Sequence, residues 1–188
     1  MPAKLIDTFG REIDYVRLSV TDRCDFRCVY CMAEDMTFLP KEDILSLEEL
    51  LSIATALIDS GIKKIRLTGG EPLIRNNIMW LIKAISKLDG LEELTLTTNG
   101  SQLKKYAQQL RDCGIKRINI SIDSLQADKF KTMTRTGNLQ QVLDGIDAAI
   151  DAGFESIKLN SVILKNRNDD EVISLVNFAR QKNIDIAF

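Results

Sequence analysis

Residues 63–72 read KKIRLTGGEP, and this stretch contains both patterns on which the fold prediction depends. In its first half the apolar Ile65 and Leu67 alternate with polar residues. Successive side chains of a strand point to opposite faces of the sheet, so this strand would have one apolar and one polar face. In its second half the chain turns into a glycine-rich loop that carries an acidic residue. The stretch therefore predicts a strand that ends in a polar loop.

The same alternation recurs along the chain and is interrupted by amphipathic stretches. The predicted strands are Tyr15–Val20, Lys64–Thr68, Glu93–Thr97, Arg117–Ile122, Ser156–Ile163 and Ile184–Phe188. The predicted helices are Leu47–Asp59, Ile78–Lys87, Leu103–Cys113, Leu139–Ala152 and Asp169–Lys182. Strands that alternate with helices indicate a parallel sheet built from βαβ crossovers.

The alternation also predicts what covers each face of that sheet. Parallel strands that are buried on both faces normally have near-continuous apolar sequences. We therefore expect helices on one face and a polar cavity on the other, as inside a wide partial barrel; a solvated sheet face is the alternative. The predicted fold class is α/β, a partial (β/α)6 barrel that ends at its sixth strand, with residues 1–188 forming a single domain.

The composition excludes several classes of function. Hydrophobic residues make up 45% and charged residues 28% of the chain, and the net charge of −2 gives no general basis for binding nucleic acid. No apolar stretch approaches the roughly 20 residues that would span a bilayer. The chain contains no histidine, which excludes Ser-His and Cys-His nucleophiles. No export signal is recognisable, so we expect a cytoplasmic protein whose clustered thiols are metal or redox ligands.

Three of the four cysteines lie within eight residues, at Cys24, Cys28 and Cys31. A structural zinc site takes four protein ligands, and this segment offers neither a histidine nor a fourth cysteine. An iron–sulfur cube that is held by three cysteines keeps one iron open for another ligand. Cys113 falls at a predicted helix end, where a buried structural cysteine is the simpler interpretation.

The unusual segments share one position relative to the predicted strands. The cysteine segment 24–31 follows the first strand, and the segments TGGEP (68–72), TTNG (97–100) and SIDS (121–124) end the next three. Parallel sheets and barrels gather their active sites at the carboxyl ends of their strands. We therefore expect these four segments to form one site.

The spacing Cys-x3-Cys-x2-Cys, with Tyr30 before the last cysteine, resembles the signature of radical S-adenosylmethionine enzymes. The strings LSVTDRCDFRCVYCM, IRLTGGEPLIR, LTLTTNG and RINISIDS are similar, in this order, to the GTP 3′,8-cyclase family of molybdenum cofactor biosynthesis. The resemblance begins near Arg11 and implies a lyase. Its three thiolates would hold a [4Fe–4S] cluster whose open iron binds S-adenosylmethionine. A 5′-deoxyadenosyl radical would then convert GTP into 3′,8-cyclo-7,8-dihydroguanosine 5′-triphosphate.

The resemblance also assigns residues to both ligands, but it leaves the catalytic residues unknown. The residues assigned to S-adenosylmethionine are Tyr30, Gly70 and Ser121. The residues assigned to GTP are Arg17, Arg66, Thr97 and Lys158. The role of Glu71 stays open between a contact in the site and a cap of the following helix.

The alternation supports the GTP assignment independently. Arg17, Arg66 and Lys158 fall on the predicted polar face of the sheet. Cations inside a barrel are unfavourable unless an anion neutralises them, and guanidinium groups match phosphate oxygens. Internal ion pairs with Asp123 or Glu71 are the alternative.

The chain also departs from the resemblance. Members of the cyclase family carry a second [4Fe–4S] cluster, held by three cysteines of a C-terminal region, which binds the guanine base. This sequence lacks those cysteines, so we expect a portion of a longer enzyme that keeps the S-adenosylmethionine half and the phosphate half of the site without performing the whole reaction. An exposed sheet edge would favour a homodimer.

The expected partners are GTP and an electron donor of unknown identity, with no membrane and no nucleic acid. Two other interpretations stay open at this stage. One is a different radical S-adenosylmethionine enzyme that acts on a peptide or another small molecule. The other is a metal-binding domain without catalytic activity.

Overall fold

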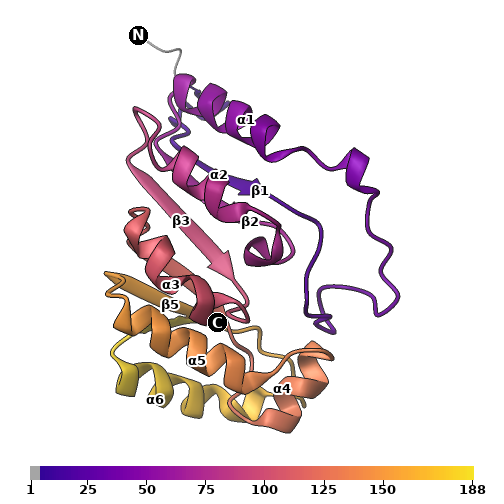
Figure 1. Cartoon of the computed structure of the whole chain (residues 1–188). Coiled ribbons are helices and arrows are strands. Elements are labelled where there is room, and N and C mark those ends of the chain that lie inside the picture. Colours follow the sequence, from indigo (N-terminus) through magenta and orange to yellow (C-terminus); the bar gives the residue numbers. More distant parts are fainter. Residues whose placement is uncertain (1–4) are drawn as a thin grey trace.

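The computed structural model describes residues 5–188 and contains one sheet of six strands in the order β1-β2-β3-β4-β5-β6. All neighbouring strands are parallel. The strands are β1 Tyr15–Ser19, β2 Lys64–Thr68, β3 Glu93–Thr98, β4 Arg117–Ser121, β5 Ser156–Asn160 and β6 Asp185–Ala187. The sheet is open, with β1 and β6 at its two edges (Figure 1). The predicted partial barrel is confirmed.

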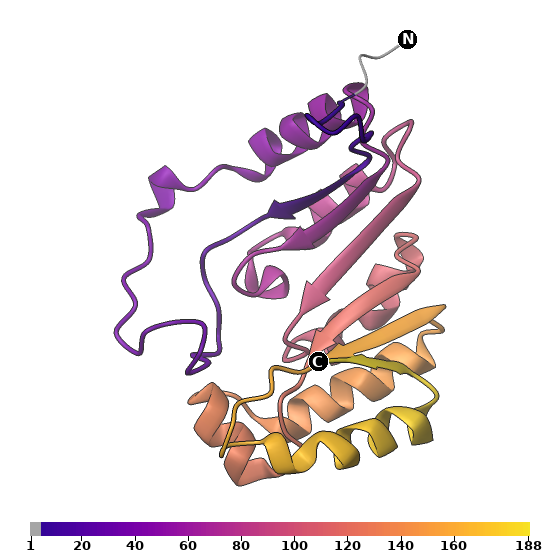
Figure 2. The ribbon, with the colours of Figure 1, turned by 180° about the vertical axis from the view of Figure 1, so that it is seen from behind.

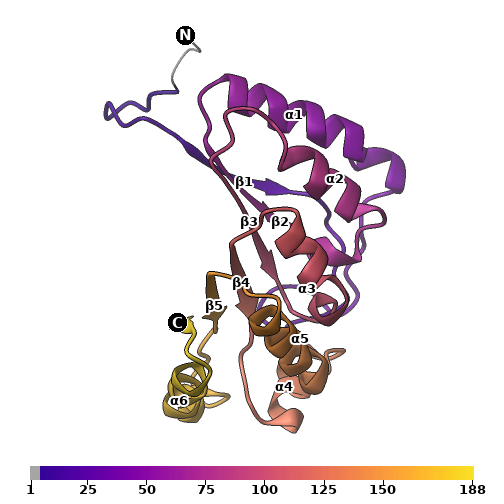
Figure 3. The ribbon, with the colours of Figure 1, turned by 60° about the vertical axis from the view of Figure 1, so that its left-hand side comes forward.

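Helices connect the strands and cover one face of the sheet (Figures 1 and 3). The α-helices are α1 Leu47–Asp59, α2 Ile78–Ile85, α3 Leu103–Asp112, α4 Ala127–Thr134, α5 Leu139–Asp151 and α6 Val172–Lys182. Three short 3-10 helices, η1 Lys41–Asp43, η2 Pro72–Ile74 and η3 Asp169–Glu171, complete the set. The five predicted helices are confirmed, with small differences at their ends. Among residues 5–188, no helix combines the length and apolar character that crossing a bilayer requires.

Helix α4 was not predicted, because its sequence ADKFKTMT contains few apolar residues. Its two large apolar side chains, Phe130 and Met133, are both buried. They are three positions apart and thus share one face of the helix. A helix that buries so short an apolar stripe cannot be recognised from periodicity alone.

The fifth strand is shorter than predicted, and side chains explain where it stops. β5 ends at Asn160, whereas the predicted strand extended to Ile163. Beyond the strand, the Val162 N–H donates to the Asp123 carboxylate (2.8 Å) and the Leu164 N–H donates to the Asn168 side chain (2.8 Å). These backbone groups bond to side chains, so the ladder does not continue.

The alternation of the strands corresponds to two different faces in the structure. In β2 the apolar Ile65 and Leu67 are fully buried, while the polar residues between them are only half-buried. Strands β4 and β5 repeat this pattern. Viewed from behind, strands β1 to β4 lie in front of their helices, so the face without helices is turned toward the reader (Figure 2). The prediction that helices cover one face is therefore confirmed.

The long connection between β1 and α1 contains only the short η1 and extends beyond the carboxyl ends of the strands (Figure 2). It carries the three clustered cysteines. The Ser46 side chain accepts a hydrogen bond from Glu49 N–H, and Glu49 bonds back to Ser46 N–H, which forms a capping box. Helix α1 therefore begins at a defined point after this long connection.

Candidate functional site

The cysteine loop, which we define as residues 20–39, lies along the loop that follows β2. The Gly70 N–H donates to Thr21 O, and the Glu71 N–H donates to Arg23 O, both at 2.8 Å. These bonds continue the pairing of β1 with β2 beyond the ends of the strands. The cysteine loop is thus attached to the sheet at its first residues.

Gly70 is needed for the close approach of these two loops. A Cβ atom at this position would lie 2.1 Å from Arg23 O, which is far inside van der Waals contact. The resemblance assigns Gly70 to S-adenosylmethionine, and a residue without Cβ would let such a ligand approach the backbone. In the structure, the backbone of the cysteine loop occupies the space beside Gly70.

Glu71 joins the loops after β2 and β3. Its Oε1 accepts hydrogen bonds from Leu73 N–H (2.9 Å) and from the Thr98 hydroxyl (2.8 Å), and its Oε2 accepts from Asn99 N–H (2.6 Å). The side chain is completely buried, and burial raises the pKa of Glu71 to about 7. The bond to Leu73 N–H caps η2, as one of the two interpretations of Glu71 expected.

The first cysteine lies against the TTNG segment that follows β3. The Asn99 Nδ2 group donates to Asp25 Oδ1 (2.7 Å) and lies 3.7 Å from Cys24 Sγ, within hydrogen-bond range for sulfur. The Ser101 hydroxyl donates to Asp25 Oδ2 (2.6 Å), and the Phe26 N–H points at Cys24 Sγ (3.4 Å). The position of Cys24 is therefore defined by a loop far away in the sequence.

The other two clustered cysteines lie in a turn that packs on the end of α4. The Cys31 N–H donates to Cys28 O (2.9 Å). The N–H groups of Arg27 and Val29 donate to carbonyls of the last two residues of α4, both at 2.9 Å. The helix that the sequence did not predict thus supports the middle of the cysteine loop.

Two arginines, one inside the loop and one just after α4, donate hydrogen bonds to backbone carbonyls of the cysteine loop. The Arg135 guanidinium donates to Arg27 O (3.3 Å) and Met32 O (3.2 Å), and Arg135 itself has a positive φ of 58°. The Arg27 guanidinium donates to Cys24 O (2.5 Å) and lies over the Phe38 ring. Motif spacing did not identify Arg135, because its role depends only on tertiary contact.

Tyr30 connects the cysteine loop to the ends of β4 and β5. Its hydroxyl donates to Asp123 Oδ2 (2.6 Å), and Asp123 Oδ1 accepts from Val162 N–H. Burial raises the pKa values of both Asp123 and Tyr30. The buried Asn168 donates to Asp123 O (2.6 Å) and fixes the backbone beside it. Ser121, at the end of β4, is half-buried on the polar side of the sheet.

The predicted phosphate-binding residues fall into two groups on the polar face. Arg17 and Arg66 are paired in the register of β1 and β2, so they lie side by side. Thr97 and Lys158 are both paired with Asn119 and form a row that is nearer the carboxyl ends. Arg66 is paired with Thr95 of β3, so Thr97 lies on the next strand and two residues nearer the carboxyl ends. Lys158 of β5 lies three strand spacings of about 4.8 Å each from Arg66.

The alternative of internal ion pairs is not found in the described part of the chain. None of the ion pairs among residues 5–188 involves Arg17, Arg66 or Lys158. Asp123 and Glu71 bond to the uncharged groups described above. Among the described residues these three cations of the polar face thus form no ion pair, although Asp185 of β6 is the register neighbour of Lys158.

Comparison with known proteins identifies the family. Residues 18–179 match the model of the radical SAM superfamily, in which SAM denotes S-adenosylmethionine. The chain belongs to this superfamily. The match begins in β1, includes the whole cysteine loop and extends into α6.

Two curated relatives of this radical SAM chain are named GTP 3′,8-cyclase. The protein from Marinobacter nauticus is 60% identical over 185 residues, which cover 98% of this chain and 56% of that protein. The protein from Pseudomonas putida (strain W619) is 61% identical over 184 residues, with coverages of 98% and 55%. The chain spans about half the length of the curated relatives it matches.

Solved radical SAM structures share the fold at low sequence identity. SuiB from Streptococcus suis bound to S-adenosylmethionine superposes with a TM-score of 0.73 and 20% identity, covering 92% of this chain and 38% of that chain. anSMEcpe with bound AdoMet and Kp18Cys peptide gives a TM-score of 0.73 and 16% identity, with coverages of 92% and 50%. The arrangement of strands and helices is therefore that of radical SAM enzymes.

The three thiols of the cysteine loop are the kind of ligand that a [4Fe–4S] cluster takes, as the superfamily implies. Within residues 5–188, no three Cys, Asp, Glu or His side chains are gathered to hold one ion. Cys24 Sγ is approached by two N–H groups, which is the environment of a cluster-ligating thiolate. Burial, with the charges of Asp123 and the neighbouring thiols, raises the pKa of Cys28 to about 12. Thiolates at this place therefore require a positively charged partner, which iron would provide.

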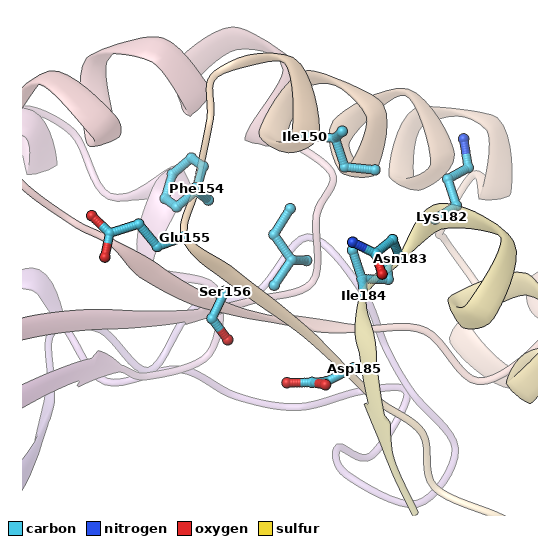
Figure 4. Close-up of a pocket in the computed structure, with 9 residues that line it drawn as sticks. Ile150, Phe154, Glu155, Ser156, Lys182, Asn183, Ile184 and Asp185 are labelled. Atoms are coloured by element: carbon cyan, nitrogen blue, oxygen red, sulfur yellow. The ribbon is translucent and has the colours of Figure 1, made fainter.

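A separate cavity lies at the opposite end of the sheet from the radical SAM motifs. It has a volume of about 310 Å³ and lies between the ends of α5 and α6 and the first residues of β5 and β6 (Figure 4). Of its three charged lining residues, Lys182 is paired with Asp147 and Glu155 with Arg111, and the third is Asp185. None of the predicted site residues lines it. The candidate site is the carboxyl edge of the sheet together with its polar face.

Proposed function

We propose that this chain is the S-adenosylmethionine-binding and triphosphate-binding portion of a GTP 3′,8-cyclase. The observation that carries the proposal is the polar face, where Arg17, Arg66 and Lys158 form no ion pair with any carboxylate of residues 5–188. Two bacterial relatives of the chain, 60% and 61% identical to it, carry the name GTP 3′,8-cyclase. Three cations on the open side of a parallel sheet suit a ligand with several phosphates.

The proposal gives the cysteine loop the role of holding the cofactors. Cys24, Cys28 and Cys31 would hold the cluster, and the residues proposed for S-adenosylmethionine are Tyr30, Gly70 and Ser121. When bound, the two cofactors supply hydrogen-abstraction chemistry at the carboxyl edge of the sheet. The hydrogen bond from Tyr30 to Asp123 closes the cysteine loop over the ends of β4 and β5. The loop would thus bring the cofactors to the edge where the polar face begins.

The two groups on the polar face would divide the nucleotide between them. Arg17 and Arg66 are register partners on neighbouring strands, and guanidinium groups bind phosphate oxygens in a forked geometry. Thr97 and Lys158 lie in the next row of the same face, two residues nearer the carboxyl ends of the strands. A triphosphate on the arginines would therefore direct the rest of the nucleotide toward the cofactors.

Three parts of the interpretation stay predictions: the cytoplasmic location, the electron donor and the homodimer. We also propose that residues 1–188 form one domain, since a single sheet extends through the described residues. The chain covers about half of its relatives, so a decisive test measures ligand binding and not turnover.

The phosphate half is tested by calorimetric titration with GTP and with guanosine. We expect heat that depends on the triphosphate in the wild type, and affinity lower by about tenfold to a hundredfold in Arg66→Ala, because a hydrogen bond to a charged group contributes about 1.5–3 kcal/mol. Arg117→Ala is the matched control, since this arginine of the same sheet is already paired with Glu93. Equal affinities in all three proteins would contradict the assignment.

The cofactor half is tested by anaerobic reconstitution with iron and sulfide. We expect a reduced-cluster signal in electron paramagnetic resonance that shifts when S-adenosylmethionine is added. Colourless protein that contains zinc would contradict the interpretation of this chain as part of a radical SAM enzyme. A shifting signal without any triphosphate-dependent heat would instead indicate a radical SAM enzyme with another substrate.

A further inference from the structure

We propose that Asn99 is a positioning residue that donates a hydrogen bond to the Cys24 thiolate and thereby raises the reduction potential of the cluster. The inference rests on the proposed function, because it requires Cys24 to be a cluster ligand. It assigns a role to the TTNG segment, which as a sequence is only a common turn.

The position of Asn99 is fixed through its backbone. It is the first residue after β3, and its N–H donates to Oε2 of the buried Glu71 (2.6 Å). The preceding Thr98 hydroxyl donates to the other oxygen of the same carboxylate (2.8 Å). The side chain of Asn99 therefore starts from a backbone that is anchored on both sides.

The orientation of the Asn99 amide is fixed as well. Its Oδ1 accepts a hydrogen bond from Ser101 N–H (2.9 Å), so this end of the amide must be the oxygen. The opposite end is then the amino group, which has two N–H donors. One reaches Asp25 Oδ1 (2.7 Å) and the other faces Cys24 Sγ (3.7 Å).

The Asn99 amino group contacts two negative groups, the Cys24 sulfur and the Asp25 carboxylate. Reduction of a cluster adds negative charge to its ligating sulfurs, and N–H groups directed at them stabilise the reduced state. Asn99 also holds the Asp25 carboxylate, which would otherwise add unscreened negative charge near the thiolate. Removing Asn99 therefore disfavours reduction in both ways.

The test is a redox titration of the reconstituted chain, followed by electron paramagnetic resonance. For Asn99→Ala we expect a ratio of reduced to oxidised cluster about tenfold lower than in the wild type at a fixed solution potential, which corresponds to about 59 mV for one electron. Ser101→Ala is the matched control. It removes the hydroxyl bond to Asp25 Oδ2 and leaves both contacts of the Asn99 amino group in place, so a shift well below that of Asn99→Ala is expected.

Iron content and thermal unfolding accompany each titration, so that a lost cluster is distinguished from a shifted potential. If Asn99→Ala retains no cluster, the isosteric Asn99→Asp replaces the donor by an oxygen and is expected to lower the potential further. If a cluster-bearing Asn99 variant keeps the wild-type potential, this inference is wrong while the proposed function stands. The same holds if Ser101→Ala shifts the potential as much as Asn99→Ala does. Wild-type protein that binds no cluster overturns both this inference and the proposed function.

Discussion

The helix-covered sheet and the cysteine loop are stabilised by different interactions. In the sheet, large apolar side chains recur at every second position, and Ile65, Leu67 and Leu96 are fully buried. In the cysteine loop, residues 20–39, the buried apolar side chains are Val20 and Phe26. The loop is held mainly by hydrogen bonds from segments that follow β2, β3 and β4 and from α4.

This difference indicates that the site can open while the sheet stays folded. Regions with few buried apolar contacts open locally at a lower free energy than the core. The loop contains the three cysteines that we propose as cluster ligands, so its local stability determines whether the proposed site is assembled. Changes in the sheet should act on the whole molecule, and changes at the loop contacts should act on the site.

Leu96→Ala tests the sheet side of the comparison and should have the largest effect. Leu96 is fully buried in β3, and removing a core leucine side chain destabilises a protein by about 2–5 kcal/mol. Urea unfolding of this variant should show one transition, with a midpoint at a lower urea concentration than in the wild type. Ile173→Ala is the control, because this side chain is 70% exposed and its loss should change stability by less than about 0.5 kcal/mol. Equal losses in both variants would contradict this view of the core.

Gly70→Ala tests the attachment of the loop. The added Cβ would lie 2.1 Å from Arg23 O, so the two backbones must separate. We expect a loss of about 1–3 kcal/mol, as in overpacked sites, and fast hydrogen exchange at Gly70 and Glu71 with unchanged protection in β3.

Gly114→Ala is the control for Gly70→Ala. A Cβ there meets nothing within 4 Å, although φ is +87°. It should show backbone strain without any change in exchange at the cysteine loop. Exchange that rises equally throughout the sheet of the Gly70 variant would show that the loop and the sheet unfold together.

The same difference explains how much could be predicted from the sequence. Alternation and helical periodicity are local patterns, so all six strands and five of the six α-helices were predicted, and the motifs were expected at one edge. The bonds that assemble the site are not local: 93 positions separate Tyr30 from Asp123, and 75 separate Asn99 from Cys24. No spacing rule predicts such contacts, so the roles of Asp123, Asn168 and Arg135 appeared only in the structure.

Glu71 joins the sheet to the loop, and its titration sharpens the comparison with an effect that is small for each pH unit. Burial raises the pKa of Glu71 to about 7 from its ordinary value of 4.5, so the folded state keeps its proton where the unfolded state has lost it. The resulting stability is fully present below about pH 4.5 and is lost as the pH rises through about 7. The decrease for one such group is at most about 1.4 kcal/mol per pH unit.

Urea unfolding of cluster-free protein between pH 5 and 8 measures this decrease against Glu71→Gln, which cannot titrate. Glutamine keeps an oxygen for Leu73 N–H and Thr98 but turns an amino group toward Asn99 N–H, so the variant should be less stable than the wild type at pH 5. The difference should narrow as the pH rises to 7, because only the wild type loses the contribution of its bound proton. Parallel pH profiles would show that Glu71 is ionised in the folded protein throughout this range, and that the link between the sheet and the loop is charged.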